Sequence, residues 1–151
     1  MRSHLNIKSW EETTNYSSAQ TDPGTGKVWA SCPNNGLEDV DAAVQAAHTA
    51  FQKYRKLNPR IRAQQMLKWY NLISEAKEDL AHILTYETGK PLAEARAELD
   101  YSLGFTWWFA GEAERIRGTV ATPAQPGRRV FTVKQPIGVA AALVPWNFPV
   151  A

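Results

Sequence analysis

The sequence has little cysteine, little excess charge and no long apolar run. Its one cysteine, Cys32, excludes an intramolecular disulfide and a metal cluster built on several cysteines. Lysine plus arginine number 17 against 15 acidic residues, so the charge predicts neither a nucleic-acid partner nor a membrane surface. A spanning helix needs about 18 consecutive apolar residues, and no such run is present. These features predict a cytosolic protein, with mitochondrial import as the alternative because residues 1–9 lack acids and include Arg2.

Complete active-site motifs are also missing. The three histidines, His4, His48 and His82, do not have the spacing of metal ligands, which predicts surface or packing roles and no metal. There is no glycine-rich dinucleotide motif, no Walker loop and no nucleophile elbow. Four carboxylates fall on predicted helices near arginines, where solvated helix faces with weak ion pairs explain them best: Glu94, Glu98, Glu112 and Glu114.

Turn formers and periodic apolar residues predict a hairpin followed by four helices. Residues 22–26 are dense in turn formers and precede a short strand pattern at residues 27–31. Apolar residues then recur at helical spacing from Val40 to Tyr54. A second helix is predicted to begin at Asn58-Pro59. A third is predicted to end at Gly89, and a fourth to run from Leu92 to Arg115.

Two strands are predicted after the helices. Residues 129–134 alternate apolar and polar side chains, and residues 139–144 are an apolar run between Gly138 and Pro145, as in a strand buried on both faces of a parallel sheet. Such a strand needs neighbouring strands and covering helices that the sequence does not contain. The expected fold class is therefore α/β, with an incomplete sheet.

The segment that follows the second strand is the one candidate for chemistry. Pro-Trp-Asn-Phe-Pro would hold Asn147 between two prolines at the carboxyl edge of a sheet, where ligands bind in open α/β folds. A fixed amide N–H can stabilise a developing oxyanion by about 3 to 4 kcal/mol. The alternative is an asparagine that only braces a turn.

The chain resembles the aldehyde dehydrogenase superfamily. The similarity rests on Val144-Pro-Trp-Asn-Phe-Pro149 after Gln135-Pro-Ile-Gly-Val139, and on four further segments in family order: residues 22–28, 38–44, 87–91 and 108–115. Glu87-Thr-Gly-Lys-Pro91 and the segment at residues 133–138 look most like the succinate-semialdehyde dehydrogenase branch. The resemblance covers residue 20 to the end.

The resemblance implies a Rossmann-like cofactor-binding domain that uses NAD or NADP. In such enzymes a cysteine thiolate attacks the aldehyde, hydride passes to the cofactor, and a glutamate-activated water releases the acid. Asn147 would supply the oxyanion-hole amide and also lie at the cofactor, and Phe148 would line the aldehyde tunnel. Tyr101 would face the same tunnel or pack in the core. The other residues expected along the cofactor are Leu143, Val144, Pro145 and Trp146.

The family's nucleophilic cysteine, general-base glutamate and glycine motif would lie beyond residue 151. The chain is therefore expected to be an N-terminal fragment, inactive alone, of an enzyme that oxidises a small semialdehyde and forms a homo-dimer or tetramer. The alternative is a short, non-catalytic interaction module that pairs through its amphipathic strand. The expected divisions are an arm (1–19), a helical part (20–127), a bridging strand (128–137), and the first sheet strand with the oxyanion loop (138–151).

Overall fold

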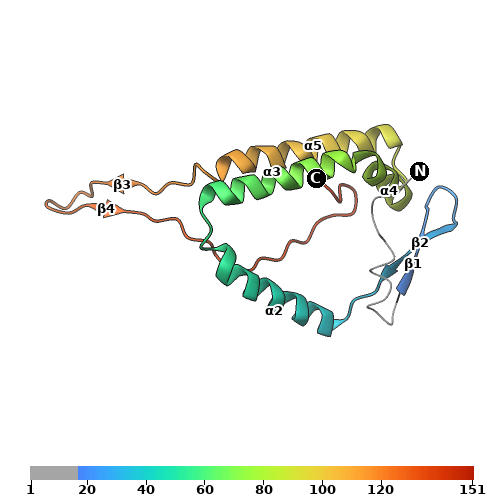
Figure 1. The fold of residues 1–151 in the computed structure, drawn as a ribbon, viewed down its shortest axis with the longest axis horizontal. Helices are drawn as coiled ribbons and strands as arrows, with labels where there is room; N and C mark the ends of the chain where they lie inside the picture. The colour runs from blue at the N-terminus through green and yellow to red at the C-terminus, as the bar shows by residue number, and fades with distance from the viewer. Residues whose placement is uncertain (1–16) are drawn as a thin grey trace.

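The computed structural model describes residues 17–151, which form four helices and two small antiparallel hairpins (Figure 1). The elements are, in order, β1 (Ser17–Thr21), β2 (Val28–Pro33), α2 (Leu37–Tyr54), α3 (Pro59–Glu75), α4 (Lys77–Thr88), α5 (Leu92–Glu112), β3 (Val120–Ala121) and β4 (Val130–Phe131). The predicted arm at 1–19 lies outside the described residues except for its last three, which belong to β1. His4 also lies outside them.

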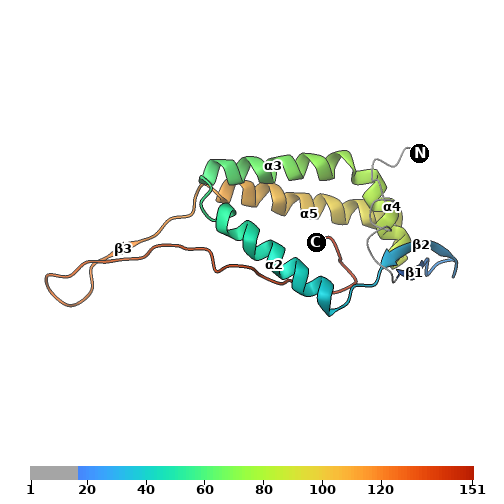
Figure 2. The same cartoon turned by 60° about the horizontal axis from the view of Figure 1, so that its bottom comes forward.

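Helices α3, α4 and α5 form a bundle in which α3 and α5 lie side by side (Figures 1 and 2). The Asn58 side chain caps α3 by accepting a hydrogen bond from the Arg60 amide at 2.9 Å, and Pro59 occupies the first helical position. Helix α4 ends at Gly89, which has a left-handed φ of 76°. Both predicted helix boundaries are confirmed.

Small side chains and leucines form the bundle core. Ala81 and Leu84 of α4 pack against Ala95 and Leu99 of α5, and Leu99 is fully buried. Alanines at these positions let the helix backbones approach closely. Burial of a leucine side chain contributes about 1.5 to 3 kcal/mol to folding stability, so Leu99 is a main contributor to the packing of α4 against α5.

Helix α2 lies apart from this bundle (Figure 2). Its amphipathic pattern was predicted correctly, yet none of its residues is buried. Val40 and Val44, on the apolar stripe, are about half exposed. The described chain therefore leaves the apolar face of α2 uncovered.

The first hairpin packs against the end of α4. Its turn is held by Asp22, whose carboxylate accepts hydrogen bonds from the Thr25 hydroxyl at 2.7 Å and the Gly24 amide at 2.8 Å. These bonds lower the pKa of the Asp22 carboxyl. Trp29 of β2 stacks on Tyr86 of α4, with ring centroids 5.3 Å apart. The predicted hairpin is confirmed, and it is tied to the helices through an aromatic pair.

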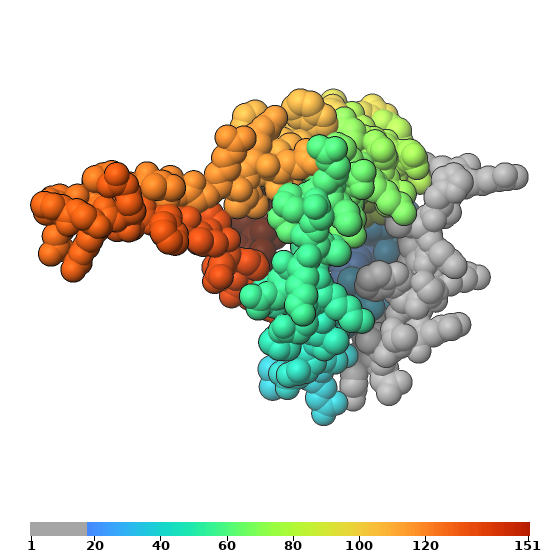
Figure 3. All heavy atoms as spheres, turned by 60° about the vertical axis from the view of Figure 1, so that its left-hand side comes forward, coloured from blue at the N-terminus to red at the C-terminus, as the bar shows by residue number. Residues whose placement is uncertain are grey.

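The second hairpin projects from the bundle (Figures 1 and 3). The strand predicted at residues 129–134 is reduced to Val130–Phe131, which pairs with Val120–Ala121. The pairing is extended by one bond, from the Thr132 amide to the Thr119 carbonyl at 2.9 Å. At Gly118 an added Cβ would collide with the Thr132 carbonyl oxygen, so the two arms approach each other at a glycine.

The strand predicted at residues 139–144 does not form. A strand exists only where a neighbouring strand accepts and donates its main-chain hydrogen bonds, and no described segment lies in that position. The apolar side chains of this segment are exposed, and Leu143 is 100% accessible. The prediction of a strand at residues 139–144 is wrong for this chain because the segments that would pair with it are not among the described residues.

Among residues 17–151, no helix is long and apolar enough to cross a membrane.

Candidate functional site

Apart from Tyr101 on α5, the residues predicted to meet cofactor and substrate lie consecutively in the C-terminal segment, at residues 143–148. Trp146 and Asn147 form a turn between Pro145 and Phe148. Trp146 is 80% exposed, and Val144 and Phe148 are also more than half exposed. Within residues 17–151 the Asn147 side-chain amide has no hydrogen-bond partner. None of the described residues therefore bonds to this amide.

The turn is anchored by a carboxylate that the sequence prediction placed on a solvated helix face. Glu98 of α5 is buried, with a side chain only 1% exposed, so that prediction is wrong. It lies between Ala95 and Leu99, on the face of α5 that packs in the bundle. Its Oε1 accepts a hydrogen bond from the Val150 amide at 2.9 Å. Glu98 thus ties α5 to the end of the Pro-Trp-Asn-Phe-Pro segment.

Lys90 completes this anchor from the link between α4 and α5. Its Nζ donates to Glu98 Oε2, and the Lys90 side chain is 12% exposed. The same Nζ donates to the Asn147 main-chain oxygen at 2.9 Å. It also lies 4.7 Å from the centre of the Phe148 ring, within cation–π range. A buried pair of this kind is costly to break, by about 3 to 5 kcal/mol when one partner is removed.

Lys90 and Glu98 are the functional candidates that sequence reasoning missed. The available signal was a carboxylate in register with the apolar face of α5, since Ala95, Leu99 and Leu103 share that face with Glu98. A charge at such a position requires a buried partner.

Of the other carboxylates in that prediction, Glu112 forms a weak ion pair of the expected kind, and Glu78, which was not predicted, forms a similar one. Arg115 contacts Glu112 at 3.0 Å one turn away, and both side chains are exposed. Arg96 of α5 contacts Glu78 of α4 at 2.7 Å with side chains 45% and 60% exposed. The Arg96 hydrogen bond lowers the pKa of the Glu78 carboxyl. These are surface pairs, which contribute little to stability.

The hollow that Tyr101 lines does not include Phe148. Tyr101 is exposed on α5 and packs edge-on against Phe105, with ring centroids 4.8 Å apart. The hollow beside it is lined entirely by α5, from Asp100 to Phe109. The core alternative for Tyr101 does not hold in this chain because the ring is 64% exposed. A tunnel shared by Tyr101 and Phe148 stays a prediction.

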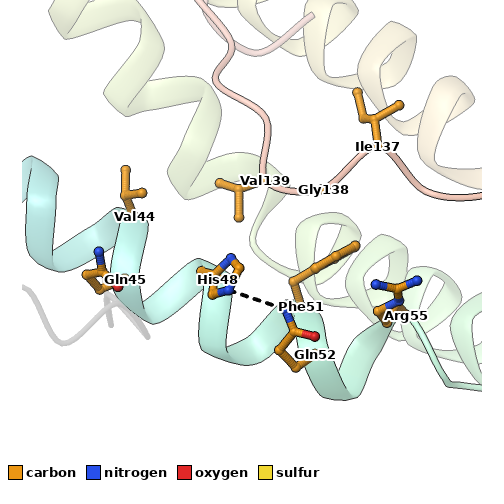
Figure 4. Close-up of a pocket in the computed structure, with 9 residues that line it drawn as sticks. All are labelled: Val44, Gln45, His48, Phe51, Gln52, Arg55, Ile137, Gly138 and Val139. Atoms are coloured by element: carbon orange, nitrogen blue, oxygen red, sulfur yellow. Dashed lines mark hydrogen bonds between the residues drawn. The ribbon is translucent and has the colours of Figure 1, made fainter.

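A separate groove of about 580 Å³ runs between α2 and residues 137–139 (Figure 4). His48 and Arg55 are its titratable groups. The His48 ring is 3.3 Å from the Gln52 amide nitrogen, and Arg55 lies over the Phe51 ring at 5.3 Å. The groove holds no paired acid and base, so its lining favours packing over catalysis.

Cys32 is exposed on β2. In the part of the chain that the structure describes, no group of three or more metal-ligating side chains is present.

Comparison with known proteins identifies the family. Residues 10–151 match the sequence profile of the aldehyde dehydrogenase family. A glutarate-semialdehyde dehydrogenase of Pseudomonas putida is 44% identical over 131 residues, covering 87% of this chain and 27% of the relative. An NADP(+) succinate-semialdehyde dehydrogenase of Escherichia coli matches with the same identity and coverage. The crystal structure of a succinate-semialdehyde dehydrogenase from Burkholderia pseudomallei superimposes with a TM-score of 0.83 and 39% identity, over 89% of this chain and 28% of that one.

These matches confirm the predicted α/β fold class and the resemblance to semialdehyde dehydrogenases. The chain spans 27% of the length of the two curated relatives. The match over residues 10–151 and the shared fold together show that the chain belongs to the aldehyde dehydrogenase family.

Proposed function

We propose that this chain is the N-terminal part of an NAD(P)-dependent aldehyde dehydrogenase that oxidises a small semialdehyde to the carboxylic acid. The observation that carries the proposal is the turn at residues 145–148. Its main chain is anchored at Asn147, while the Asn147 amide has no protein partner among the described residues. The semialdehyde class is supported by the names of the relatives, which act on succinate or glutarate semialdehyde.

The role of Asn147 follows from this free amide. An asparagine that braces its turn uses its side chain in a local hydrogen bond. The Asn147 side chain makes none within the described chain, and its main-chain oxygen is what Lys90 holds. The N–H groups are therefore available to the substrate oxygen when negative charge develops on it. One such donor lowers the barrier by about 3 to 4 kcal/mol.

The residues before Asn147 suit the cofactor. Leu143 and Trp146 present exposed apolar side chains at the end of an extended segment, which fits the flat face of a nicotinamide and its ribose. When bound, NAD or NADP accepts a hydride from the substrate carbon. Leu143, Val144, Pro145 and Trp146 would orient it and exclude water beside Asn147.

The residues that would bind the pyrophosphate, attack the aldehyde and activate water are not among these 151. The proposal therefore assigns catalysis to the complete enzyme, and we expect it to be a cytosolic homo-oligomer.

The alternative is a non-catalytic interaction module. The projecting β3–β4 hairpin favours it, because Val120 and Phe131 are 77% and 72% exposed on strands with unpaired edges. The transcript sequence beyond the codon for residue 151 distinguishes the dehydrogenase from the interaction module. A frame that continues to a cysteine nucleophile supports the dehydrogenase, and a stop codon in a mature transcript supports the module.

The activity itself is tested with purified complete enzyme and a panel of aldehydes, by following NAD(P)H formation. We expect a higher kcat/KM for succinate or glutarate semialdehyde than for uncharged aldehydes of equal length. Absence of turnover with every aldehyde, in a folded enzyme that binds NAD(P), would refute the proposal.

A further inference from the structure

Glu98 is the one charged side chain that is buried among residues 17–151. A carboxylate in that position is unfavourable unless each oxygen has a partner. Both oxygens are satisfied, Oε2 by Lys90 Nζ and Oε1 by the Val150 amide. A contact that only fixed the α4–α5 link to α5 would need just the first of these two bonds. The second links the buried charge to the C-terminal segment.

Lys90 contacts the same C-terminal segment at two further points. Its ammonium group has three donors, and one of them goes to the Asn147 main-chain oxygen at 2.9 Å. The charge also faces the Phe148 ring. Apart from the bonds made by Lys90 and Glu98, no hydrogen bond joins residues 139–150 to the rest of the described chain. The pair thus contacts the C-terminal segment at Asn147, Phe148 and Val150.

We infer that Lys90 and Glu98 are positioning residues that fix the main chain at Asn147, so that its amide is already aimed at the substrate oxygen. The inference rests on the proposed function, because it acts through the oxyanion role of Asn147. The contacts that the pair makes with the C-terminal segment are to main chain or to the Phe148 ring, so neither residue bonds to the Asn147 side-chain amide. A displacement of about 1 Å at a reacting group can cost about 10²-fold in rate, so such an anchor has a kinetic consequence.

The test uses the complete enzyme and the variant Glu98→Gln. Glutamine keeps the shape and can still accept from the Val150 amide, but it removes the charge that holds Lys90. We expect kcat to fall by about 10- to 100-fold, with the KM for NAD(P) changed less than about two-fold. Hydrogen exchange in the peptide at residues 147–151 should accelerate, while exchange in α3 stays unchanged.

Arg96→Gln is the matched control. The Arg96–Glu78 pair also joins α5 to α4, but it is exposed and does not touch the turn. We expect this variant to retain the kcat of the parent enzyme. If Glu98→Gln does not fold, the double variant Lys90→Met/Glu98→Gln removes both charges, avoids an unpaired buried charge, and should show the same loss of kcat.

A double-mutant cycle separates positioning from a general structural role. In an Asn147→Ala background, Glu98→Gln should lower kcat no further, because the amide that it positions is already absent. Multiplicative losses, or an unchanged kcat in Glu98→Gln alone, would overturn the inference. The oxyanion role of Asn147 fails separately if Asn147→Ala alone leaves kcat unchanged, and the proposed function fails if the parent enzyme turns over no aldehyde.

Discussion

Replacing Asn147 by alanine in the complete enzyme should remove transition-state stabilisation and little else. The side-chain amide has no partner among residues 17–151, so its loss breaks no hydrogen bond within that part of the chain. The anchor from Lys90 goes to the main-chain oxygen, which alanine retains. We therefore expect a change in unfolding free energy within about 0.5 kcal/mol, as for an exposed position.

The kinetic effect should be much larger. Loss of one oxyanion donor costs about 2.7 to 4 kcal/mol, which corresponds to a fall of about 10² to 10³ in kcat. Cofactor affinity should change little, because we propose that the amide meets the substrate oxygen chiefly when charge develops on it. Trp146→Ala is the contrast. This exposed ring is proposed to lie along the cofactor, so its loss should affect NAD(P) affinity at least as much as turnover.

The assay combines steady-state kinetics, titration with NAD(P) and thermal unfolding of both variants. A near-normal kcat for Asn147→Ala would refute the oxyanion role. So would a loss of activity that is fully explained by unfolding or by failure to bind NAD(P), and the turn-bracing alternative would then stand.

Three further predictions concern stability and the isolated chain. Purified residues 1–151 should show no turnover with any aldehyde; cofactor reduction that persists after Cys32→Ser would contradict this. The isolated chain should also lack a cooperative thermal transition and should bind a hydrophobic dye, because residues 139–144 are exposed; a monodisperse monomer with a sharp transition would argue against it. In the complete enzyme, Gly89→Ala should destabilise by more than about 1 kcal/mol, since Gly89 has φ 76° and an added Cβ would lie 2.9 Å from Pro23 Cγ. Gly104→Ala, a helical position with open space around the added methyl, is the control and should be neutral or stabilising by up to about 1 kcal/mol; equal effects at the two glycines would show the reasoning to be wrong.

Local chemistry explains which features could be predicted from the sequence. The Asn58 cap, the stop at Gly89 and the turn at Asp22 each depend on a few neighbouring residues, and all are present. The segment at residues 139–144 has the composition of a buried strand, but its hydrogen-bonding partners are not among the described residues. A strand depends on contacts distant in sequence, so the pattern alone was insufficient.

In the candidate site, too, the locally determined feature could be predicted and the long-range contacts could not. The position of Asn147 between two prolines pointed to a rigid turn, and the turn is present. The anchor could not be predicted, because Lys90 and Glu98 reach Asn147 and Val150 across sequence separations of 57 and 52 residues. Only the fold brings these groups together. The roles of residues 143–148 toward cofactor and substrate stay predictions.

The most direct test of the central claim transfers this segment into an active relative. Residues 20–151 would replace the matching part of the Escherichia coli succinate-semialdehyde dehydrogenase, which is 44% identical over 131 residues. The account predicts a folded chimera that reduces NADP with succinate semialdehyde and loses about 10² to 10³ in kcat on Asn147→Ala. A chimera that folds and binds NADP but has no turnover, or whose kcat is indifferent to Asn147→Ala, would contradict it.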